Sequence, residues 1–405
     1  MKIAIIGGGA AGFFSAIAAK TNHPKAEVIL FEKTQKLLAK VRISGGGRCN
    51  VTNASTSIKQ LSEAYPRGGK AMKKALRIFS TPNTREWFES RGVRLYAQDD
   101  NRVFPVSDSS QSIIDCLMSE TRKLGVSIQT GSRIEAIEAQ ANEQLILHFF
   151  KTHHPSQIFD KVIVASGGSP KKSGLDWLEK LGHKIEKPVP SLFTFNMPSE
   201  KITQLMGVVA ENTLVRIQGS KLQSQGSLLI THWGMSGPAI LKLSAFGARL
   251  LSESAYRFKV QVNWTGVVNQ EEVKKDIEDA IEVHPKKKLS NVRLFGLPER
   301  LWLFLLQKSD LQPNKRWLDL GKKNIHKLVT VLTHDVYDVS GKTTFKEEFV
   351  TCGGVSLKSI NVSTMESKVC KNLYFAGEVM DIDGITGGYN FQAAWTTGFI
   401  AGKLG

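Results

Sequence analysis

The chain has 405 residues, 41% of them hydrophobic, so it can bury a large core and should form two or three domains. Lysine plus arginine outnumber aspartate plus glutamate by 54 to 37, and the resulting charge of +17 attracts anions of every kind without choosing among them. The four cysteines have no C-x-x-C or metal-ligand spacing, so we expect neither a disulfide framework nor a metal site. Beyond the N-terminal stretch no apolar run nears bilayer-spanning length, so we expect a cytoplasmic protein without a membrane span.

Residues 1–20 predict a strand, a tight turn and a helix. The apolar run 3–6 stops at a cluster of glycines, and 13–20 has helical composition. Gly7, Gly9 and Gly12 have the spacing G-x-G-x-x-G, in which the glycines permit the turn, the approach of a pyrophosphate and close packing of the helix. Bound phosphates would then meet the N-terminus of the helix.

A second predicted strand, 27–31, ends in Glu32. Glu32 follows Gly12 by twenty residues, a spacing at which an acidic side chain accepts hydrogen bonds from the ribose hydroxyls of an adenosine. A secretory signal peptide is the competing interpretation, because Lys2 precedes an apolar stretch up to Ala19. The glycines interrupt that apolar stretch and the signal peptide leaves the second strand unexplained, so the sequence favours a dinucleotide site.

A second glycine-rich loop has the sequence S-G-G-G-R-C-N-V-T-N over 44–53. Its backbone can lie flat against a ligand while Arg48 supplies a forked donor. A flexible surface turn is the alternative, but such a turn has little need for Arg42, Arg48 and Asn50 so close together. We therefore predict a second loop that binds phosphate.

Two predictions concern the region that follows. Residues 70–92 are expected to form a helix whose basic side chains, Lys70, Lys73, Lys74 and Arg77, lie on a solvated face, since no aromatic residues alternate with them. The short run Lys286–Lys288 adds to the basic surface. The strand 133–137, which contains Ile134, is expected to be the third parallel strand, beneath the adenine.

The apolar strand 161–165 ends in Ser166, Gly167 and Gly168, which is typical of a buried central strand that meets a ligand at its carboxyl end. From about 190 to 346 the pattern changes to short antiparallel strands and to helices near 270–283, 296–306 and 322–332. His232, in an unusual loop of this region, is either a proton-transfer group or a hydrogen-bonded structural histidine.

The C-terminal segment returns to dinucleotide-fold character. A strand at 374–376 leads into a loop with Gly377, Glu378 and Asp381, and a glycine pair at 387–388 opens the last helix. Backbone N–H groups and the positive end of that helix would stabilise negative charge on a bound ring. Asp381 is placed to bind a ribityl chain, or it is an ordinary loop carboxylate.

These three parts together resemble the two-dinucleotide-binding-domain flavoproteins. The strings at 44–53, 364–368 and 377–392 are similar to those of the bacterial FAD-dependent oxidoreductase family that includes aminoacetone oxidase and bile-acid-type enone reductase. The resemblance implies noncovalent FAD and an α/β fold: a discontinuous Rossmann-like FAD-binding domain (1–189 and 347–405) with an inserted β-barrel-like domain (190–268 and 330–346) and a helical subdomain (269–329).

From the motifs and the resemblance together, the expected cofactor contacts are Gly7, Gly9, Ala10, Ala11, Gly12, Glu32, Lys33, Arg42, Gly46, Gly47, Arg48, Cys49, Asn50, Ile134, Ala165, Ser166, Gly167, Gly168, Gly377, Glu378, Asp381, Gly387, Gly388, Tyr389, Asn390 and Phe391. The candidate catalytic groups are His232, Tyr389 and Cys49. Cys49 has no partner cysteine nearby, so no redox disulfide is expected.

The implied activity is hydride transfer between flavin N5 and a small organic substrate, with NAD(P)H or oxygen as the other partner. No second nicotinamide-binding glycine motif is present, so NAD(P)H would bind without a dinucleotide domain of its own. Two other hypotheses stay open: a flavin-dependent RNA-modifying or RNA-binding protein, suggested by the charge of +17, and a non-catalytic FAD-binding scaffold. The substrate and the oligomeric state do not follow from the sequence.

Overall fold

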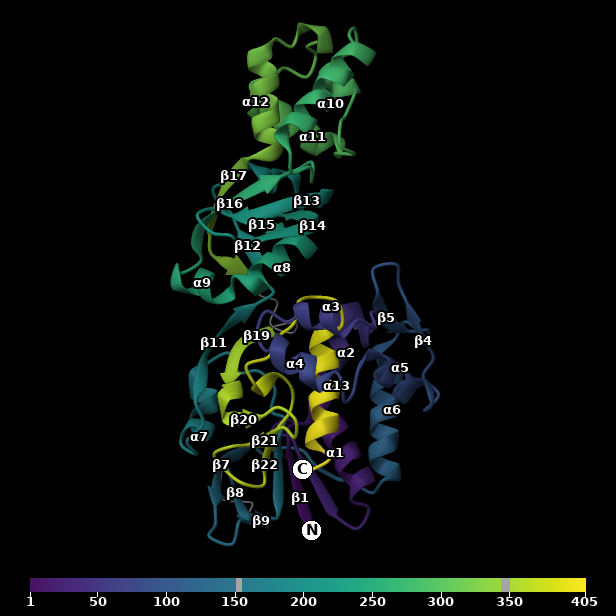
Figure 1. The fold of residues 1–405 in the computed structure, drawn as a ribbon, viewed down its shortest axis with the longest axis vertical. Coiled ribbons are helices and arrows are strands. Elements are labelled where there is room, and N and C mark those ends of the chain that lie inside the picture. Colours follow the sequence, from purple (N-terminus) through teal and green to yellow (C-terminus); the bar gives the residue numbers. More distant parts are fainter. Residues whose placement is uncertain (151–154, 344–349) are drawn as a thin grey trace. The chain divides into compact units, whose positions relative to one another are not determined.

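A computed structural model describes residues 1–150, 155–343 and 350–405. The chain divides into two compact units (Figure 1): unit 1 combines Met1–Ser191 with Lys346–Gly405, and unit 2 is Leu192–Phe345. Unit 2 is therefore an insertion in the sequence of unit 1. The predicted boundary at 346/347 lies outside the described residues, and the separate helical subdomain at 269–329 stays a prediction.

Unit 1 is built on a seven-stranded sheet in the order β20-β21-β22-β10-β1-β2-β6. The five strands from β22 to β6 pair in parallel, and β20 and β21 add an antiparallel edge. The central strands are almost fully apolar and buried, as expected for parallel strands covered on both faces. The strands are β1 (Lys2–Ile6), β2 (Glu27–Phe31), β6 (Ser127–Gln129), β10 (Lys161–Val164), β20 (Ile360–Asn361), β21 (Glu366–Ser367) and β22 (Leu373–Phe375).

Two long helices from opposite ends of the chain pack against each other in unit 1 (Figure 1). They are α1 (Ala10–Asn22) and α13 (Tyr389–Ala401), and glycines bring them close: a Cβ at Gly398 would lie 2.8 Å from the Ala11 carbonyl oxygen. The other helices of unit 1 are α2 (Ala39–Ile43), α3 (Ile58–Glu63), α4 (Gly69–Ala75), α5 (Thr81–Glu89), α6 (Ser110–Lys123) and α7 (Asp176–Glu179).

Three small antiparallel sheets complete unit 1. One joins β3 (Thr52–Asn53), β5 (Arg102–Pro105) and β4 (Leu95–Ala97), the second joins β7 (Ile134–Ala139), β8 (Leu145–Phe149) and β9 (Gln157–Phe159), and the third pairs β11 (Ile185–Ser191) with β19 (Val350–Val355). The third sheet lies at the point where the chain leaves unit 1 and returns to it.

Two predictions for unit 1 are wrong. Residues 70–92 are not one helix, because α4 ends at Ala75 and α5 starts afresh at Thr81, with a capping box between Ser80 and Asn83. The strand with Ile134 is β7, which belongs to an antiparallel sheet; the parallel neighbour of β2 is β6. A strand at 126–129 is also predicted by the sequence, and this strand, β6, takes the parallel position instead.

Unit 2 is an antiparallel seven-stranded sheet with helices attached. The order is β17-β16-β13-β14-β15-β12-β18, with β12 (Thr194–Asn196), β13 (Val209–Ile217), β14 (Gln223–Thr231), β15 (Gly234–Ser236), β16 (Arg257–Asn263), β17 (Asp335–Ser340) and β18 (Lys342–Thr343). Helices α8 (Pro238–Phe246) and α9 (Ala248–Glu253) follow β15, and the remaining helices, α10 (Gln270–Val283), α11 (Glu299–Lys308) and α12 (Lys322–Thr333), pack together as the helical part of unit 2 (Figure 1). Within the described residues, none of the helices combines the length and hydropathy needed to span a bilayer.

Candidate functional site

The turn between β1 and α1 is closed by glycines and faces open space at one of them. Gly7 has a φ of +117°, and a Cβ there would lie 2.4 Å from the Ala165 carbonyl oxygen, so no side chain fits. A Cβ at Gly12 would lie 1.9 Å from the Gly7 carbonyl oxygen. A Cβ at Gly9, the N-cap of α1, would meet no atom within 4 Å. The turn thus offers a bare helix N-terminus to an anionic ligand.

The Glu32 carboxylate is fixed beside this turn. Its Oε2 accepts a hydrogen bond from the Gly8 backbone N–H at 2.8 Å, and its Oε1 accepts from the backbone N–H and the hydroxyl of Thr34, each at 2.9 Å. Two carboxylate oxygens offer about four acceptor positions, so one remains for a ribose hydroxyl. The next residue, Lys33, is exposed.

The second glycine loop is a short 3₁₀ turn, Ser44–Gly47. Gly46 and Gly47 face open space, since a Cβ at either would meet no atom within 4 Å. The two nearby arginines are already engaged: the Arg48 guanidinium lies 4.3 Å from the centre of the Phe104 ring, and Arg42 Nη1 donates to Gln111 Oε1 at 2.8 Å. The open backbone, more than these side chains, is therefore the ligand-facing feature of the loop.

The next two residues have structural surroundings. Burial raises the pKa of the Cys49 thiol to about 12, so at neutral pH it is protonated and shielded from solvent. This geometry argues against Cys49 as a nucleophile. With its amide oriented to satisfy its neighbours, Asn50 accepts a hydrogen bond from the Gly388 N–H at 2.9 Å, which links the second loop to the start of α13.

At the end of β10 the chain approaches the C-terminal segment closely. A Cβ at Gly168 would lie 2.5 Å from both Glu378 Oε1 and Thr351 Oγ1. Glu378 accepts from the Thr351 backbone N–H at 2.8 Å and from Lys40 Nζ at 2.7 Å. Among the described residues, the buried Thr351 hydroxyl has no hydrogen-bond partner, which suits an oxygen-rich ligand in this place. Of the neighbouring predicted residues, Ala165 is buried, Ser166 is exposed, and Gly167 faces open space.

The loop that opens α13 is held in shape from several directions. Gly388, the N-cap, has a φ of +88°, and a Cβ there would lie 2.3 Å from the Thr52 carbonyl oxygen. The Asn390 side chain both accepts from the Gly384 N–H at 2.8 Å and donates to its carbonyl at 2.9 Å. The Tyr389 carbonyl accepts a hydrogen bond from the Tyr65 hydroxyl at 2.8 Å. The predicted contact Asn390 is thus occupied in shaping the loop.

The remaining predicted residues lie in unit 1, except for His232. Gly377 lies close to Ala11, because a Cβ at Gly377 would be 2.7 Å from the Ala11 Cβ. The Asp381 backbone N–H donates to the Val355 carbonyl at 2.9 Å. The Phe391 ring stacks on that of Trp395, with ring centres 5.7 Å apart. Ala10 begins α1, Gly387 precedes the N-cap of α13, and Ile134 begins β7 as a buried residue. His232 belongs to unit 2, where it is exposed and its ring lies 3.5 Å from that of Trp233 at an interplanar angle of 45°.

Sequence reasoning missed Tyr65, Arg67, Thr351 and Asp383, all within the same part of unit 1. Tyr65 contacts the first residue of α13 and Arg67 contacts the loop before it, through hydrogen bonds that span more than 300 residues. No local pattern marks such residues. Thr351 lies two residues before Gly353, but the glycine pair 353–354 packs against backbone, since a Cβ at Gly353 would lie 2.5 Å from the Lys187 carbonyl oxygen and one at Gly354 2.4 Å from the Val379 carbonyl oxygen.

The unit 1 residues fit an extended dinucleotide. One compact unit contains glycines that face open space, at 9, 46, 47 and 167, and the fixed carboxylate of Glu32 after β2. The same unit contains the Thr351 hydroxyl, which has no hydrogen-bond partner among the described residues. Within the described ranges there is no group of three or more His, Cys, Asp and Glu side chains arranged to hold a metal ion. The arrangement can bind phosphates through backbone N–H groups and a ribose through Glu32.

Comparison with known proteins agrees with this fold. The model of the HI0933-like protein Rossmann domain matches residues 1–404. The chain belongs to this family. The predicted resemblance and the predicted α/β class with a Rossmann domain and further sheet and helical regions are therefore confirmed.

Proteins with similar sequences have different names. The 3-dehydro-bile acid delta(4,6)-reductase of Clostridium scindens is 28% identical over 410 residues, which cover 99% of this chain and 98% of the relative. The ribosomal RNA dihydrouridine synthase of Haemophilus influenzae is 28% identical over 403 residues, which cover 98% and 96%. A solved structure, 3-ketosteroid delta1-dehydrogenase from Sterolibacterium denitrificans, has a TM-score of 0.53 at 11% identity and covers 99% of this chain and 98% of that one, a likeness of fold alone.

Proposed function

We propose that this HI0933-like protein is an FAD-dependent reductase that adds hydrogen across a carbon–carbon double bond conjugated with a carbonyl group. The observation that carries the proposal is the glycine cradle of unit 1, in which the helix α1 N-terminus and the loop 44–47 leave backbone open to a ligand. Glu32 would hold the adenosine ribose, and the α1 N-terminus would hold the pyrophosphate.

The flavin, when bound, supplies a hydride acceptor and donor at N5 between NAD(P)H and the substrate. The chain would supply orientation and charge stabilisation. Gly388 is the N-cap of α13, and the N–H groups at the start of that helix, with the positive end of its dipole, would stabilise negative charge on a bound ring. Overall, NAD(P)H and one proton are consumed and the substrate double bond gains two hydrogen atoms.

The substrate class follows from chemistry that two kinds of relative share. A delta(4,6)-unsaturated 3-oxo steroid and a uracil ring both carry a C=C bond conjugated with a carbonyl, and the two relatives are named a reductase and a dihydrouridine synthase. Addition of hydride to such a bond leaves negative charge that a proton must quench. We assign this proton to the Tyr389 hydroxyl, in the first residue of α13, which is protonated at neutral pH as tyrosines ordinarily are.

The RNA-directed form is a second candidate function. It is favoured by the charge of +17 and by two relatives, from Haemophilus influenzae and Escherichia coli, named ribosomal RNA dihydrouridine synthase at 28% and 29% identity. In this form the conjugated double bond is the C5=C6 bond of a uridine within RNA. The small-molecule form rests on the bile-acid relative.

One experiment separates these possibilities. The purified protein is reconstituted with FAD, reduced anaerobically with NADH or NADPH while the flavin absorbance is followed, and then offered a 3-oxo-Δ4,6 steroid, a uridine-containing RNA, or oxygen. We expect bleaching by one nicotinamide and rapid reoxidation by one of the two unsaturated substrates. Reoxidation by oxygen alone would make the protein an oxidase, and a bound flavin that no nicotinamide reduces would make it a scaffold. A protein that stays colourless after reconstitution would overturn the proposal entirely.

A further inference from the structure

Two stretches of unit 2 that are distant in sequence bring basic side chains together at one place. The segments 284–291 and 312–323 hold seven cationic residues and one acid, Asp319; we call the seven the basic tip, and they are Lys286, Lys287, Lys288, Lys315, Arg316, Lys322 and Lys323. The segments pair through their backbones: Leu289 N–H donates to the Lys315 carbonyl at 2.8 Å and Trp317 N–H donates to the Lys287 carbonyl at 3.0 Å. This pairing places Lys286–Lys288 beside Lys315 and Arg316, and Lys322 and Lys323 follow in the first turn of α12.

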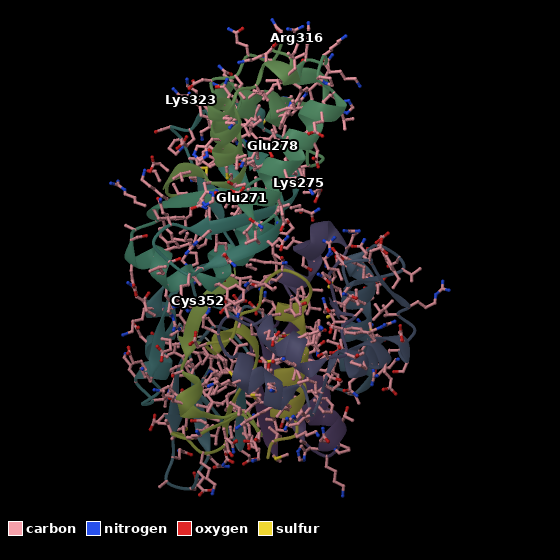
Figure 2. All side chains as sticks on the ribbon, turned by 45° about the horizontal axis from the view of Figure 1, so that its top comes forward. Glu271, Lys275, Glu278, Arg316, Lys323 and Cys352 are labelled. Atoms are coloured by element: carbon pink, nitrogen blue, oxygen red, sulfur yellow. The ribbon has the colours of Figure 1, made fainter. Side chains whose placement is uncertain are left out.

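The basic tip stands on a rigid apolar base. Leu289, Trp302 and Trp317 are fully buried, the two indole rings stack with centres 6.3 Å apart, and Trp302 Nε1 donates to the Leu289 carbonyl at 2.8 Å. Figure 2 shows Arg316 and Lys323 on this helical part of unit 2, where both are exposed. Because this apolar base fixes the backbone, the positions from which the basic side chains extend are set before any partner arrives.

The charges of the basic tip are poorly compensated within the described part of the chain. Arg316 pairs with Asp319 at 2.9 Å, whereas none of the six lysines forms an ion pair there. Lys322 and Lys323 lie in the first turn of α12, where the positive end of the helix dipole disfavours cations and where no acid is present. Helix α10 carries six acids, including Glu271 and Glu278, together with two lysines, one of which is Lys275 (Figure 2).

We propose that the basic tip is a docking surface for the phosphate backbone of double-helical RNA. The inference rests on the RNA-directed form of the proposed function. Lysine ammonium groups suit single phosphate charges, and a surface of this kind binds without reading sequence. Single-stranded RNA is a poorer fit, because the tryptophan of the tip, Trp317, is buried and offers no stacking platform. An anionic membrane is also a poorer fit, since the exposed apolar residues beside the tip, Val283 and Leu318, are aliphatic and few.

The test measures binding of the FAD-loaded protein to a fluorescent, fully paired RNA hairpin by anisotropy at 50 to 200 mM KCl. The tip variant carries Lys286→Gln, Lys287→Gln, Lys288→Gln and Lys315→Gln. The matched control removes four exposed lysines of unit 1 by Lys59→Gln, Lys70→Gln, Lys73→Gln and Lys74→Gln. Circular dichroism and the melting temperature verify that each variant is folded.

We expect the tip variant to bind the hairpin at least about tenfold more weakly at 100 mM KCl, and to lose up to about 0.9 in the slope of log K against log salt for each phosphate contact removed. The control should lose less than about threefold, the screened long-range effect of an equal charge change. Wild-type affinity and slope in the tip variant, or an equal loss in the control, would overturn the proposal.

Two further arms identify other partners and separate this proposal from the activity. Lysine-dependent binding to phosphatidylserine vesicles without binding to the hairpin would replace RNA by a membrane and overturn the proposal. A protein that reduces a conjugated steroid but ignores RNA would refute the docking surface and leave the reductase standing. A protein that binds RNA through the basic tip but takes up no FAD would support the docking surface and refute the reductase.

Discussion

Arg67 and Asp383, which lie 316 residues apart, meet in a two-point ion pair inside unit 1: Arg67 Nε donates to Asp383 Oδ1 at 2.6 Å, and Arg67 Nη2 donates to Oδ2. Asp383 is fully buried and also accepts from the Ser191 hydroxyl at 2.8 Å. Three segments are thereby joined: the start of α4, the end of β11 and the loop before α13. Since Ser191 is the last residue before unit 2, the pair anchors the loop next to the point where the chain leaves unit 1.

Removing one partner of this ion pair should lower the free energy of unfolding far more than replacing both partners together. We expect Arg67→Met or Asp383→Leu alone to lower the free energy of unfolding by about 3–5 kcal/mol, because each leaves a buried charge without its partner. The double variant should cost less than the sum of the two, and urea unfolding of all four proteins closes the cycle. Additive losses, or single losses below about 1 kcal/mol, would contradict this account.

Two glycines of the first turn should respond to alanine in opposite ways. Gly9→Ala should leave the apo protein folded, because its Cβ meets no atom within 4 Å, and should weaken FAD binding, because that Cβ enters the space assigned to the pyrophosphate. Gly12→Ala should destabilise the protein itself, since its Cβ would lie 1.9 Å from a carbonyl oxygen. Melting temperatures and FAD titrations measure both effects. Gly321→Ala in unit 2, also in open space, is the control, and FAD binding by Gly9→Ala as tight as by the control would refute the cradle.

Glu32→Gln should weaken FAD binding roughly 10- to 100-fold, since a hydrogen bond to a charged group contributes about 1.5–3 kcal/mol. The amide keeps one acceptor oxygen and brings an N–H₂ group towards the donors of Gly8 and Thr34. Isothermal titration with FAD and with FMN identifies the cause, because FMN has no adenosine ribose. An equal loss for both flavins would show that Glu32 acts through the shape of the turn.

Tyr389→Phe should retain FAD and lose turnover. If the Tyr389 hydroxyl delivers the proton, its removal should lower kcat about 10²- to 10⁴-fold with the flavin still reduced by NAD(P)H at the wild-type rate. The matched variant is Tyr65→Phe, which removes the hydroxyl that donates to the Tyr389 carbonyl and leaves the Tyr389 hydroxyl in place. Similar losses in both variants would point to loop position as the cause.

The cysteine thiols should be unreactive in the folded protein. All four cysteines are buried, so Ellman's reagent at pH 8 should find none before unfolding and four after it. Burial raises the pKa of Cys49 from 9.0 to about 12, so its contribution to stability is complete below pH 9 and is lost as the pH rises towards 12. Urea unfolding at pH 7, 9 and 11 should therefore show a decline that is shallower in Cys49→Ala. A fast-reacting thiol at pH 8 would reopen the case for a catalytic Cys49.

Local signals explain which parts of this fold were predictable. The strand, turn and helix at 1–31 and the start of the helix at Gly388 follow from glycine positions and apolar periodicity, and the structure has them where the sequence predicts them. The cap of α10 by Asn269 is equally local, since its side chain accepts from the Glu271 N–H. The break at Ser80 had a signal too, a serine before Thr81-Pro82, which the helical composition of its neighbours obscured.

Contacts between distant residues explain the rest. No residue pattern near Ile134 indicates that its strand, β7, pairs with β8, or that β6 is the strand that pairs with β2. The bond from Tyr65 to Tyr389 and the ion pair of Arg67 with Asp383 depend on the final packing of the chain, as does the empty hydrogen-bonding position of Thr351. The candidate cofactor contacts on glycine motifs were accessible from the sequence, whereas the side chains that hold those motifs in place were not.

The split of unit 1 around unit 2 determines when the protein can mature during its synthesis. β22 pairs with β10 and α13 packs against α1, so the first 191 residues lack their partners until the last segment has been translated. The remaining 214 residues (405 − 191) take on the order of 10 to 40 s at about 5–20 residues per second. For that interval the nascent chain exposes the apolar faces of β10 and α1 to chaperones, while unit 2 can fold ahead of the domain that surrounds it in sequence.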